Sequence, residues 1–243
     1  MLHLIENSKG GRNLSGLAND GVNWKEIFKK TEDSLTSSIF GPLFYLPVEL
    51  LCDILFRSTY ESSAFPLTGR LLNYQFWPRW QNDSGSYKEP DLLIEFENFN
   101  IIIEAKRFDY SMQNSNQWEE EIKAYFSEFG FKKDVYMIAV GGIFKNDEST
   151  TLFQYLNITV KIVKCRWGRI LKQLISIQKH LDKYRGFVNA NDAILNIIND
   201  LILTFRMHGF QTGSLFETMT NNLSLKKSIA EYKVSLEANF KRK

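Results

Sequence analysis

The chain has 243 residues and a formal net charge of +2, and hydrophobic residues make up 44% of it. This supply of apolar side chains is enough for a sizeable core and excludes a globally disordered protein. Since the charge is nearly balanced, a polyanionic partner would have to be held by a local basic patch and not by a uniformly basic surface.

Cysteine use and hydropathy predict a soluble, cytoplasmic protein without a membrane partner. Cys52 and Cys165 lie far apart without metal-ligand spacing, so we expect two reduced thiols and no zinc site. The N-terminal segment carries Glu6 and no long apolar region, unlike a signal peptide. Polar residues interrupt the most apolar late segment, so no stretch approaches the length of a membrane span.

The first quarter of the chain predicts a loose segment followed by helices. Residues 1–22 are polar and glycine-bearing without clear periodicity, and we expect them to be loosely ordered. Capping and breaking residues then mark short helices, and apolar spacing marks an amphipathic one. The expected helices cover 23–30, 31–39 (capped by Thr31 or Ser34 and ended by Gly41-Pro42) and 48–60.

An aromatic-rich strand is expected at 73–80, before a polar loop at 81–88. Trp77 and Trp80 allow two interpretations. They are suited to stacking on unpaired bases, but aromatic residues beside a sheet more often belong to the core, which we favour.

Two short apolar runs, 92–96 and 101–107, predict a β-hairpin with charged residues at its open end. A turn centred on Glu97-Asn98 places Asp91 opposite Glu104, whereas a wider four-residue loop places Asp91 opposite Lys106. In both registers these three side chains share one face, within roughly 5 to 8 Å of one another. Two carboxylates converging beside an ammonium group indicate a site for a hard divalent cation.

Pro90-Asp91, twelve intervening residues and then Glu104-Ala105-Lys106 resemble the signature of the PD-(D/E)xK nuclease superfamily. The resemblance implies a restriction-endonuclease-like mixed β-sheet flanked by helices, with the motif on two adjacent strands. It also implies that Asp91 and Glu104 bind Mg²⁺, for which Mn²⁺ can substitute. Ala105 would offer its backbone carbonyl to the metal, and Lys106 would handle the attacking water or the developing charge.

The same resemblance suggests two further site residues. The Glu-Asp-x-Leu-Thr-Ser stretch from Glu32 is similar to the first helix of several bacterial members, where an acid reaches the metal. The alternative is that Glu32 only lies at a helix N-terminus, where its negative charge interacts favourably with the helix dipole. Gln117 lies on the helix after the E-x-K strand, where some members use a Gln, but it is also compatible with an ordinary solvated position. Tyr125 is not carried over, because its spacing from Gln117 differs from the form in which a Tyr follows.

The second half of the chain continues the alternation of helices and strands. Apolar periodicity predicts a helix stopped by Gly130, an interior strand closed by Gly141-Gly142, and another strand and helix after it. A further apolar helix exceeds a single narrow stripe, which is compatible with a partner subunit. The expected elements are helices 115–129, 167–181 and 190–210, strands 134–140 and 157–163, and a charged helix or tail at 224–243.

A basic stretch runs from Lys161 to Arg185 with Asp182 as its single acid. It is suited to neutralising phosphates and orienting nucleic acid, or it is a helix face whose charges answer acids elsewhere. The residues assigned to a phosphate contact are Lys164, Arg166, Arg169 and Lys172.

These features predict a Mg²⁺-dependent phosphodiesterase that cuts DNA, an endonuclease of bacterial restriction or anti-phage defence by analogy of fold. The alternative is a catalytically inactive, nuclease-like subunit that binds nucleic acid or a partner protein. The expected organisation is a loose N-terminus (1–22), a nuclease core (23–186) and a helical C-terminal extension of the same domain (187–243). DNA is the expected partner, and a homodimer or a larger defence complex is compatible with the pattern.

Overall fold

The computed structural model describes residues 31–66, 69–81, 85–110, 112–183 and 190–212. The expectations for 1–22, 23–30, Arg185 and 224–243 lie outside these residues. The described residues up to Phe210 belong to one compact unit, and Gln211 and Thr212 fall outside it.

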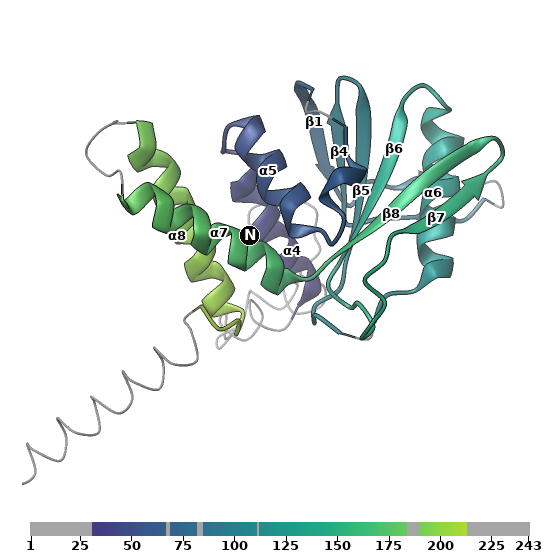
Figure 1. Ribbon diagram of the computed structural model, residues 1–243. Helices are drawn as coiled ribbons and strands as arrows, with labels where there is room; N and C mark the ends of the chain where they lie inside the picture. Colours follow the sequence, from purple (N-terminus) through teal and green to yellow (C-terminus); the bar gives the residue numbers. More distant parts are fainter. Residues whose placement is uncertain (1–30, 67–68, 82–84, 111, 184–189, 213–243) are drawn as a thin grey trace, which may run out of the picture. The chain divides into compact units, whose positions relative to one another are not determined.

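Six strands of the described residues form one mixed sheet, in the order β1-β4-β5-β6-β8-β7 (Figure 1). The three central strands β5, β6 and β8 are parallel, so their carboxyl ends lie at the same edge. The outer strands β1, β4 and β7 pair antiparallel with their neighbours. The bounds are β1 (Leu71–Phe76), β4 (Leu92–Phe96), β5 (Phe99–Ala105), β6 (Asp134–Val140), β7 (Thr151–Tyr155) and β8 (Ile158–Cys165), with a separate pair β2 (Trp80–Gln81) and β3 (Tyr87–Lys88).

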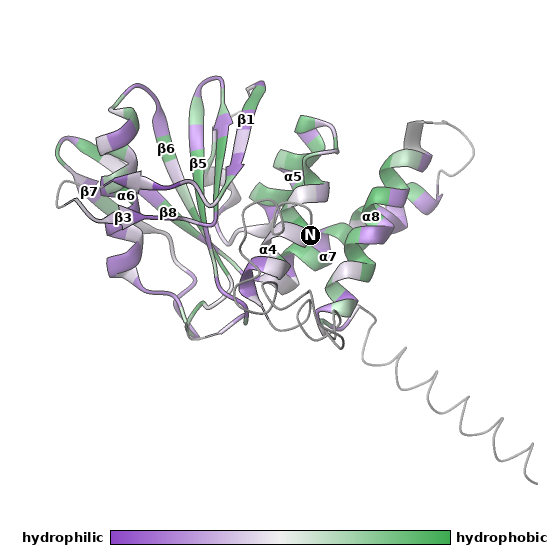
Figure 2. Ribbon diagram, turned by 180° about the vertical axis from the view of Figure 1, so that it is seen from behind, coloured by the Kyte–Doolittle hydropathy of each residue, from purple (hydrophilic) through white to green (hydrophobic). Residues whose placement is uncertain are grey.

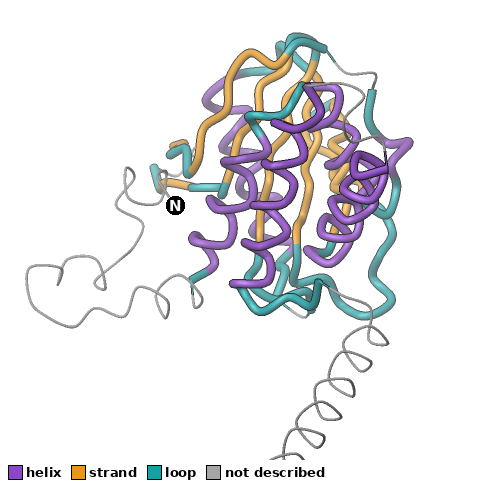
Figure 3. Tube along the Cα trace, turned by 90° about the vertical axis from the view of Figure 1, so that its left-hand side faces the viewer, coloured by secondary structure: helices purple, strands orange, loops and turns teal. Residues whose placement is uncertain are grey.

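Helices cover both faces of this sheet. One face packs with α4, α5 and the pair α7 and α8, while the other packs against α6 (Figures 1 and 3). Alternate residues of β5 enter the two cores, because side chains alternate across a strand. The bounds are α4 (Glu32–Leu43), α5 (Val48–Ser58), α6 (Ser115–Phe129), α7 (Trp167–Lys183) and α8 (Ala190–Met207), with a short 3₁₀ turn η1 (Ser62–Ala64).

Because helices cover both faces of the sheet, its central strands contain continuous apolar runs. Every residue of β5 is buried, including Asn100 and Glu104, and the apolar colouring of the inner strands is visible in Figure 2. A strand covered on both sides needs apolar residues at successive positions, not only at alternate ones. A charged residue within such a strand is therefore an exception that calls for a partner.

Several expected elements agree with the structure. The helix 115–129 and the strand 134–140 have the expected bounds, and Gly130 follows the helix with φ +70°. The core interpretation of the tryptophans is also confirmed, since Trp77 is 5% and Trp80 is 2% exposed. The coarser fold class, a mixed α/β sheet flanked by helices, is as expected.

Other expectations were wrong in detail. The helix expected at 31–39 continues through Gly41-Pro42 to Leu43, because Phe40 and Leu43 are fully buried in the core and this packing offsets the proline. The strand expected at 73–80 ends at Phe76, since Trp77 takes a left-handed backbone conformation with φ +50°. Strand β7 was not expected, because it is an edge strand whose residues alternate between half-buried and exposed.

The helix α8 belongs to the same compact unit as the sheet. It packs against α7 and α4. Within the ranges that the structure describes, no helix combines the length and apolarity needed to cross a membrane.

Candidate metal and nuclease site

The β4–β5 hairpin has the narrower of the two expected registers. Leu92 pairs with Ile103 and Glu95 with Asn100, so the turn centres on Glu97-Asn98. Continued by one residue, this register places Asp91 opposite Glu104. Side chains that lie opposite each other on paired strands share a face, so the two carboxylates converge.

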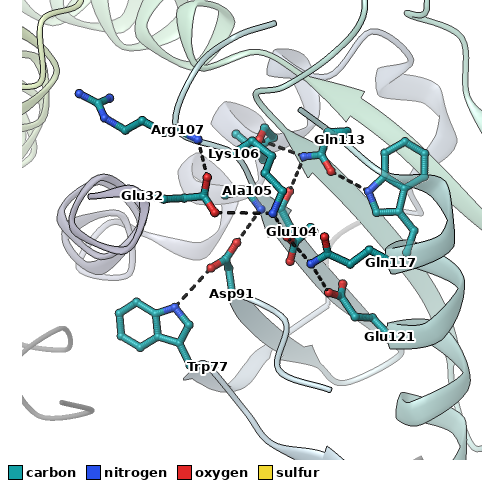
Figure 4. A network of polar contacts seen from close by, with 12 residues as sticks. Glu32, Trp77, Asp91, Glu104, Ala105, Lys106, Arg107, Gln113, Gln117 and Glu121 are labelled. Atoms are coloured by element: carbon teal, nitrogen blue, oxygen red, sulfur yellow. Dashed lines mark hydrogen bonds and ion pairs between the residues drawn. The ribbon is translucent and has the colours of Figure 1, made fainter. Parts of the chain in front are cut away.

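Asp91 is fixed by two hydrogen bonds. Its Oδ2 accepts the backbone N–H of Ala105 at 2.7 Å, and its Oδ1 accepts the indole N–H of Trp77 at 3.3 Å (Figure 4). Asp91 is 7% exposed. The side chain of the neighbouring Ala105 lies in the core on the face covered by α4, α5, α7 and α8. The contact ties the end of β5 to the start of β4 through the carboxylate.

Glu104 and Lys106 form an ion pair at the end of β5. The ammonium Nζ of Lys106 contacts Glu104 Oε1 and lies 3.6 Å from Glu32 Oε1. Glu104 is only 2% exposed, whereas the side chain of Glu32 is 31% exposed. Lys106 is therefore held between an acid from the sheet and an acid from the first residue of α4.

Glu32 reaches this site because of where α4 begins. Thr31 caps the helix by accepting the N–H of Ser34 at 3.3 Å, so Glu32 is its first residue. Its Oε2 also accepts the backbone N–H of Arg107 at 2.7 Å. The structure thus brings Glu32 to the residues that sequence analysis singled out.

The helix α6 supplies two side chains from the other direction. Gln117 donates from Nε2 to Glu104 Oε1 at 2.7 Å and to Glu121 Oε1 at 2.8 Å (Figure 4). Gln117 therefore contacts the site as expected. Glu121 was not among the expected site residues, although its four-residue spacing from Gln117 on a helix is the signal that could have identified it.

The backbone around Lys106 is held by neighbours that sequence analysis also missed. Gln113 donates to the carbonyl oxygens of Glu104 and Val140 at 3.1 and 3.3 Å, and Trp167 donates to that of Lys106 at 2.8 Å. At Gly141, φ is +67°, and a Cβ would overlap the carbonyl oxygen of Lys106. Only glycine combines this left-handed conformation with such a close approach.

The carboxyl groups of the site resist ionisation. Burial, together with the negative charge of Glu104, raises the pKa of Asp91 well above its usual range. Burial and the charge of Glu121 raise the pKa of Glu104 to about 8, and burial raises the pKa of Glu121 to about 7. Three buried acids near one ammonium group are therefore short of positive charge at neutral pH.

The pKa of Lys106 is raised as well, which for a lysine favours the charged form. Burial alone would lower it, but the carboxylates of Glu104, Glu32 and Asp91 outweigh that effect and raise it above its ordinary value. Glu121 also has an unsatisfied acceptor: its Oε2 is buried without a hydrogen-bond partner among the described residues.

The acids are not arranged as a ready-made metal cage. Within the described residues, no group of three or more His, Cys, Asp or Glu side chains is placed so that it could hold a metal ion. The oxygens instead contact Lys106, Gln117, Trp77 and backbone N–H groups. The donor types nevertheless suit Mg²⁺ or Mn²⁺, which prefer oxygen ligands.

Three of the four residues assigned to phosphate contact, Lys164, Arg166 and Arg169, have partners within the fold. Lys164 is 1% exposed and pairs with Asp147. Arg166 donates to Glu148 at 2.7 Å and to the hydroxyl of Tyr60 at 2.6 Å. Lys164 is buried because β8 is an inner strand, and its pairing with Asp147 agrees with the alternative in which these charges answer acids elsewhere in the fold.

Arg169 is engaged in the same way, and Lys172 is not. Arg169 donates to the carbonyl oxygens of Ser58 and Thr59 at 2.6 and 2.8 Å. Lys172, in contrast, has an exposed side chain on α7. Of the four residues assigned to phosphate contact, Lys172 is the one that the fold leaves at the surface.

Comparisons with known proteins place the chain beside one uncharacterized relative. No protein-family model matches it. Over 141 residues, or 57% of the chain, it is 32% identical to an uncharacterized protein of Pasteurella multocida (strain Pm70). The match covers 53% of that relative, so the chain spans about half of its length.

A solved structure was also found at low similarity. It is the refined half-complex from a tetradecameric assembly of Thermococcus gammatolerans McrB AAA+ hexamers with bound McrC. The match covers 63% of the present chain and 31% of the chain in that assembly, at 9% identity and a TM-score of 0.26. A likeness at this level carries no argument about fold or function.

Proposed function

We propose that the chain is a metal-dependent nuclease with a restriction-endonuclease-like fold, which hydrolyses phosphodiester bonds in DNA. The observation that supports this most is the convergence of Asp91, Glu104 and Lys106 at one end of the hairpin. Glu32 and Gln117 join them from helices that lie on opposite faces of the sheet. Residues more than seventy positions apart thus meet around one ammonium group.

The charge balance of this cluster favours the binding of a cation. Asp91, Glu104 and Glu121 all have raised pKa values, because burial and mutual repulsion penalise their ionised forms. A divalent cation bound among them would offset both penalties. The residues that would hold it are Asp91, Glu104, Glu32 and the backbone carbonyl of Ala105.

Each protein group then has a separate task. The bound metal would polarise the phosphate and lower the pKa of a coordinated water. Lys106 is positioned to balance negative charge that develops on the phosphoryl group, as its contacts with Glu104 and Glu32 hold it at the site. Gln117 orients Glu104 through the hydrogen bond to Oε1.

Exposed aromatic residues near Lys106 are consistent with a nucleic-acid substrate. Phe108 is 63% and Tyr110 is 57% exposed, and both follow the site within four residues. Their backbone is pinned, since Asp109 between them accepts the N–H of Trp167 at 2.6 Å. Exposed aromatic rings suit stacking against unpaired bases.

A second candidate is a nuclease-like subunit that binds nucleic acid or a protein without cleaving. It is favoured by the ion pair itself, because Lys106 occupies the oxygen of Glu104 that a metal would need, and by the lack of a prearranged metal group in the described residues. The restriction or anti-phage setting, with a homodimer or a larger defence complex, remains a proposal by analogy of fold.

The test is a cleavage assay on purified protein. Circular and linear DNA, single- and double-stranded, are incubated with Mg²⁺, with Mn²⁺ and with EDTA. We expect cleavage only with metal, and its loss in Asp91→Asn but not in Glu119→Gln, which alters a 42% exposed acid on α6. Full activity in Asp91→Asn would refute the assignment. DNA binding without cleavage of any of these substrates would favour the second candidate.

A further inference from the structure

A small pocket lies beside the candidate site on the face covered by α6. Its volume is about 190 Å³, below the 300–1,000 Å³ that pockets for drug-sized ligands occupy, so it suits a single small ring system. Its lining combines aromatic, hydroxyl and charged groups, which include Gln113, Trp118, Phe144, Asp147, Thr151 and Lys164.

The pocket has a cation at its buried side. Lys164 is 1% exposed, and its Nζ pairs with Asp147 and lies 5.8 Å from the centre of the Trp118 ring. An ammonium group has three N–H donors. Asp147 is the hydrogen-bond acceptor that Lys164 has among the described residues, so donor capacity remains for a ligand.

The pocket also has an anion, and this restricts what it binds. The side chain of Asp147 is 47% exposed, so it can meet an entering group. A phosphate would be repelled by this carboxylate. A neutral ring that carries a hydrogen-bond acceptor next to hydrogen-bond donors can satisfy Lys164 and Asp147 together.

The sheet register connects this pocket to the candidate site. Glu104 pairs with Ala139 on β6, and Ala139 pairs with Lys164 on β8. Paired residues point to the same face, so Glu104 and Lys164 lie two strands apart, about 10 Å, on the α6 side. Gln113 lies between them, because it donates to the carbonyl of Glu104 and accepts the indole N–H of Trp118 at 2.7 Å.

We propose that this pocket binds an unpaired guanine base of a nucleic acid whose scissile phosphate lies at the metal site proposed at Asp91 and Glu104. Lys164 donates to the carbonyl O6 of the base, the contact that lysine makes with guanine in grooves. Asp147 accepts from the adjacent ring N–H and amino group, which a carboxylate can do with both oxygens. Phe144, 49% exposed at the lining, packs against the ring.

Guanine fits better than the other bases for a chemical reason. It presents a carbonyl next to two adjacent N–H donors, so the ammonium and both carboxylate oxygens are used. The other bases offer the carboxylate a single neighbouring donor site. A base that has left its stack is read in this manner by enzymes that act on extruded nucleotides. The position beside the scissile phosphate rests on the proposed function, but base binding itself does not.

The first experiment measures binding in EDTA, where no metal-dependent cleavage occurs. Short single-stranded oligothymidylates with one central dG, dA or dC are compared by fluorescence anisotropy. We expect the dG probe to bind about ten-fold more tightly than the dA and dC probes. Asp147→Asn should remove this preference, and Phe144→Ala should weaken all probes. Equal binding of the three probes to the unaltered protein would overturn the proposal.

A matched control and a direct readout complete the test. Phe131→Ala removes a 50% exposed aromatic residue near the opposite end of α6 from the pocket and should change neither affinity nor preference. The indole N–H resonance of Trp118, one of five tryptophans, should move on titration with guanosine monophosphate and not with adenosine monophosphate. If the Trp118 signal did not move when the protein was saturated with the dG probe, the proposal would also be overturned.

The two proposals fail in distinguishable ways. Metal-dependent cleavage without a dG preference, and unaffected by Asp147→Asn, would refute the guanine pocket and leave the nuclease assignment. A dG preference without cleavage of any substrate would support the pocket and refute the nuclease assignment. A wild-type dimer that Phe144→Ala converts to monomer, with no change in probe binding, would assign this surface to protein association and refute the pocket.

Discussion

The carboxyl ends of β5 and β8 lie at the same edge of the sheet, and both carry charged residues with opposite outcomes. At β8, the cations find separate partners: Lys164 pairs with Asp147, and Arg166 pairs with Glu148. At the end of β5, in contrast, Asp91, Glu104 and Glu32 lie around the single ammonium group of Lys106. The first region is neutralised within the fold, and the second has an excess of acids.

This difference shows that a run of like charges in a sequence does not identify a binding surface. The basic segment looked like the stronger electrostatic feature, but Lys164 and Arg166 pair with loop acids, and Arg169 donates to backbone carbonyls. The acid cluster involves fewer residues, yet burial leaves it unbalanced. A site for an external cation is indicated where partners are too few, not where charges are most numerous.

The largest effect is expected from removing the ammonium group of the acid cluster. Lys106→Met should reduce metal-dependent cleavage by about 10²-fold or more, since it removes the ammonium group that balances the developing charge. Lys123→Met, which removes a 38% exposed lysine paired with Glu119 and Glu120, is the matched control and should keep its activity. Equal cleavage rates for Lys106→Met and the unaltered protein would contradict this role.

The acid cluster should also make stability depend on pH in the absence of metal. The pKa of Glu104 is raised to about 8, so the folded state binds its proton more tightly than the unfolded state does. Stability is then fully present below the unfolded-state pKa, near 4.5, and is lost as pH rises through about 8. Urea unfolding should show a decrease on the order of a few kcal/mol across this window.

Glu104→Gln provides the control for that pH dependence. The variant cannot ionise, so its stability should change less between these pH values than that of the unaltered protein. Added Mg²⁺ should restore stability at high pH only in the unaltered protein, because a ligand bound to the folded state stabilises it. The same pH slope in both proteins would show that Glu104 does not carry the effect.

In the basic segment, the engaged Arg169 and the exposed Lys172 should have different effects. Arg169→Met should lower the free energy of unfolding by about 1.5–3 kcal/mol, because the carbonyls of Ser58 and Thr59 lose a charged donor. Lys172→Ala should leave stability unchanged but reduce the salt dependence of DNA binding by about one unit of slope. The reverse pattern would mean that Arg169 is a phosphate contact after all.

The smallest effect is expected at the start of α4. Thr31→Ala removes the cap that accepts the N–H of Ser34, which typically costs about 1 kcal/mol, and loosens the first turn that holds Glu32. Chemical unfolding and cleavage rates should both fall slightly, and Thr31→Asp, another good capping residue, should restore both. If Thr31→Ala lost as much activity as Lys106→Met, α4 would have a more direct role in cleavage than holding Glu32.

Much of the fold followed from local patterns. The helix at 115–129 and the strand at 134–140 have strong periodicity and clear end signals, so their bounds were predicted to the residue. The edge strand β7 was missed because its exposed positions lack an apolar run. The end of α4 was misplaced because the burial of Leu43 outweighs a local breaking signal, and this cannot be seen before the core is assembled.

The site was predictable where it depends on one hairpin. Asp91, Glu104 and Lys106 follow from strand alternation and the turn position, which the sequence left between two choices. Glu121 and Gln113 depend on how α6 packs on the sheet, so their contacts needed the tertiary structure. The burial of Lys164 needed the tertiary structure as well, since only the pairing of β8 with β6 and β7 makes β8 an inner strand.

Calorimetric titration with Mn²⁺ tests most directly whether the acid cluster is a cation site. The account predicts binding to the unaltered protein and to Glu119→Gln, with protons released near neutral pH as Glu104 ionises, and no comparable binding to Glu104→Gln or Asp91→Asn. Equal Mn²⁺ binding by all four proteins, or none by the unaltered protein, would contradict it.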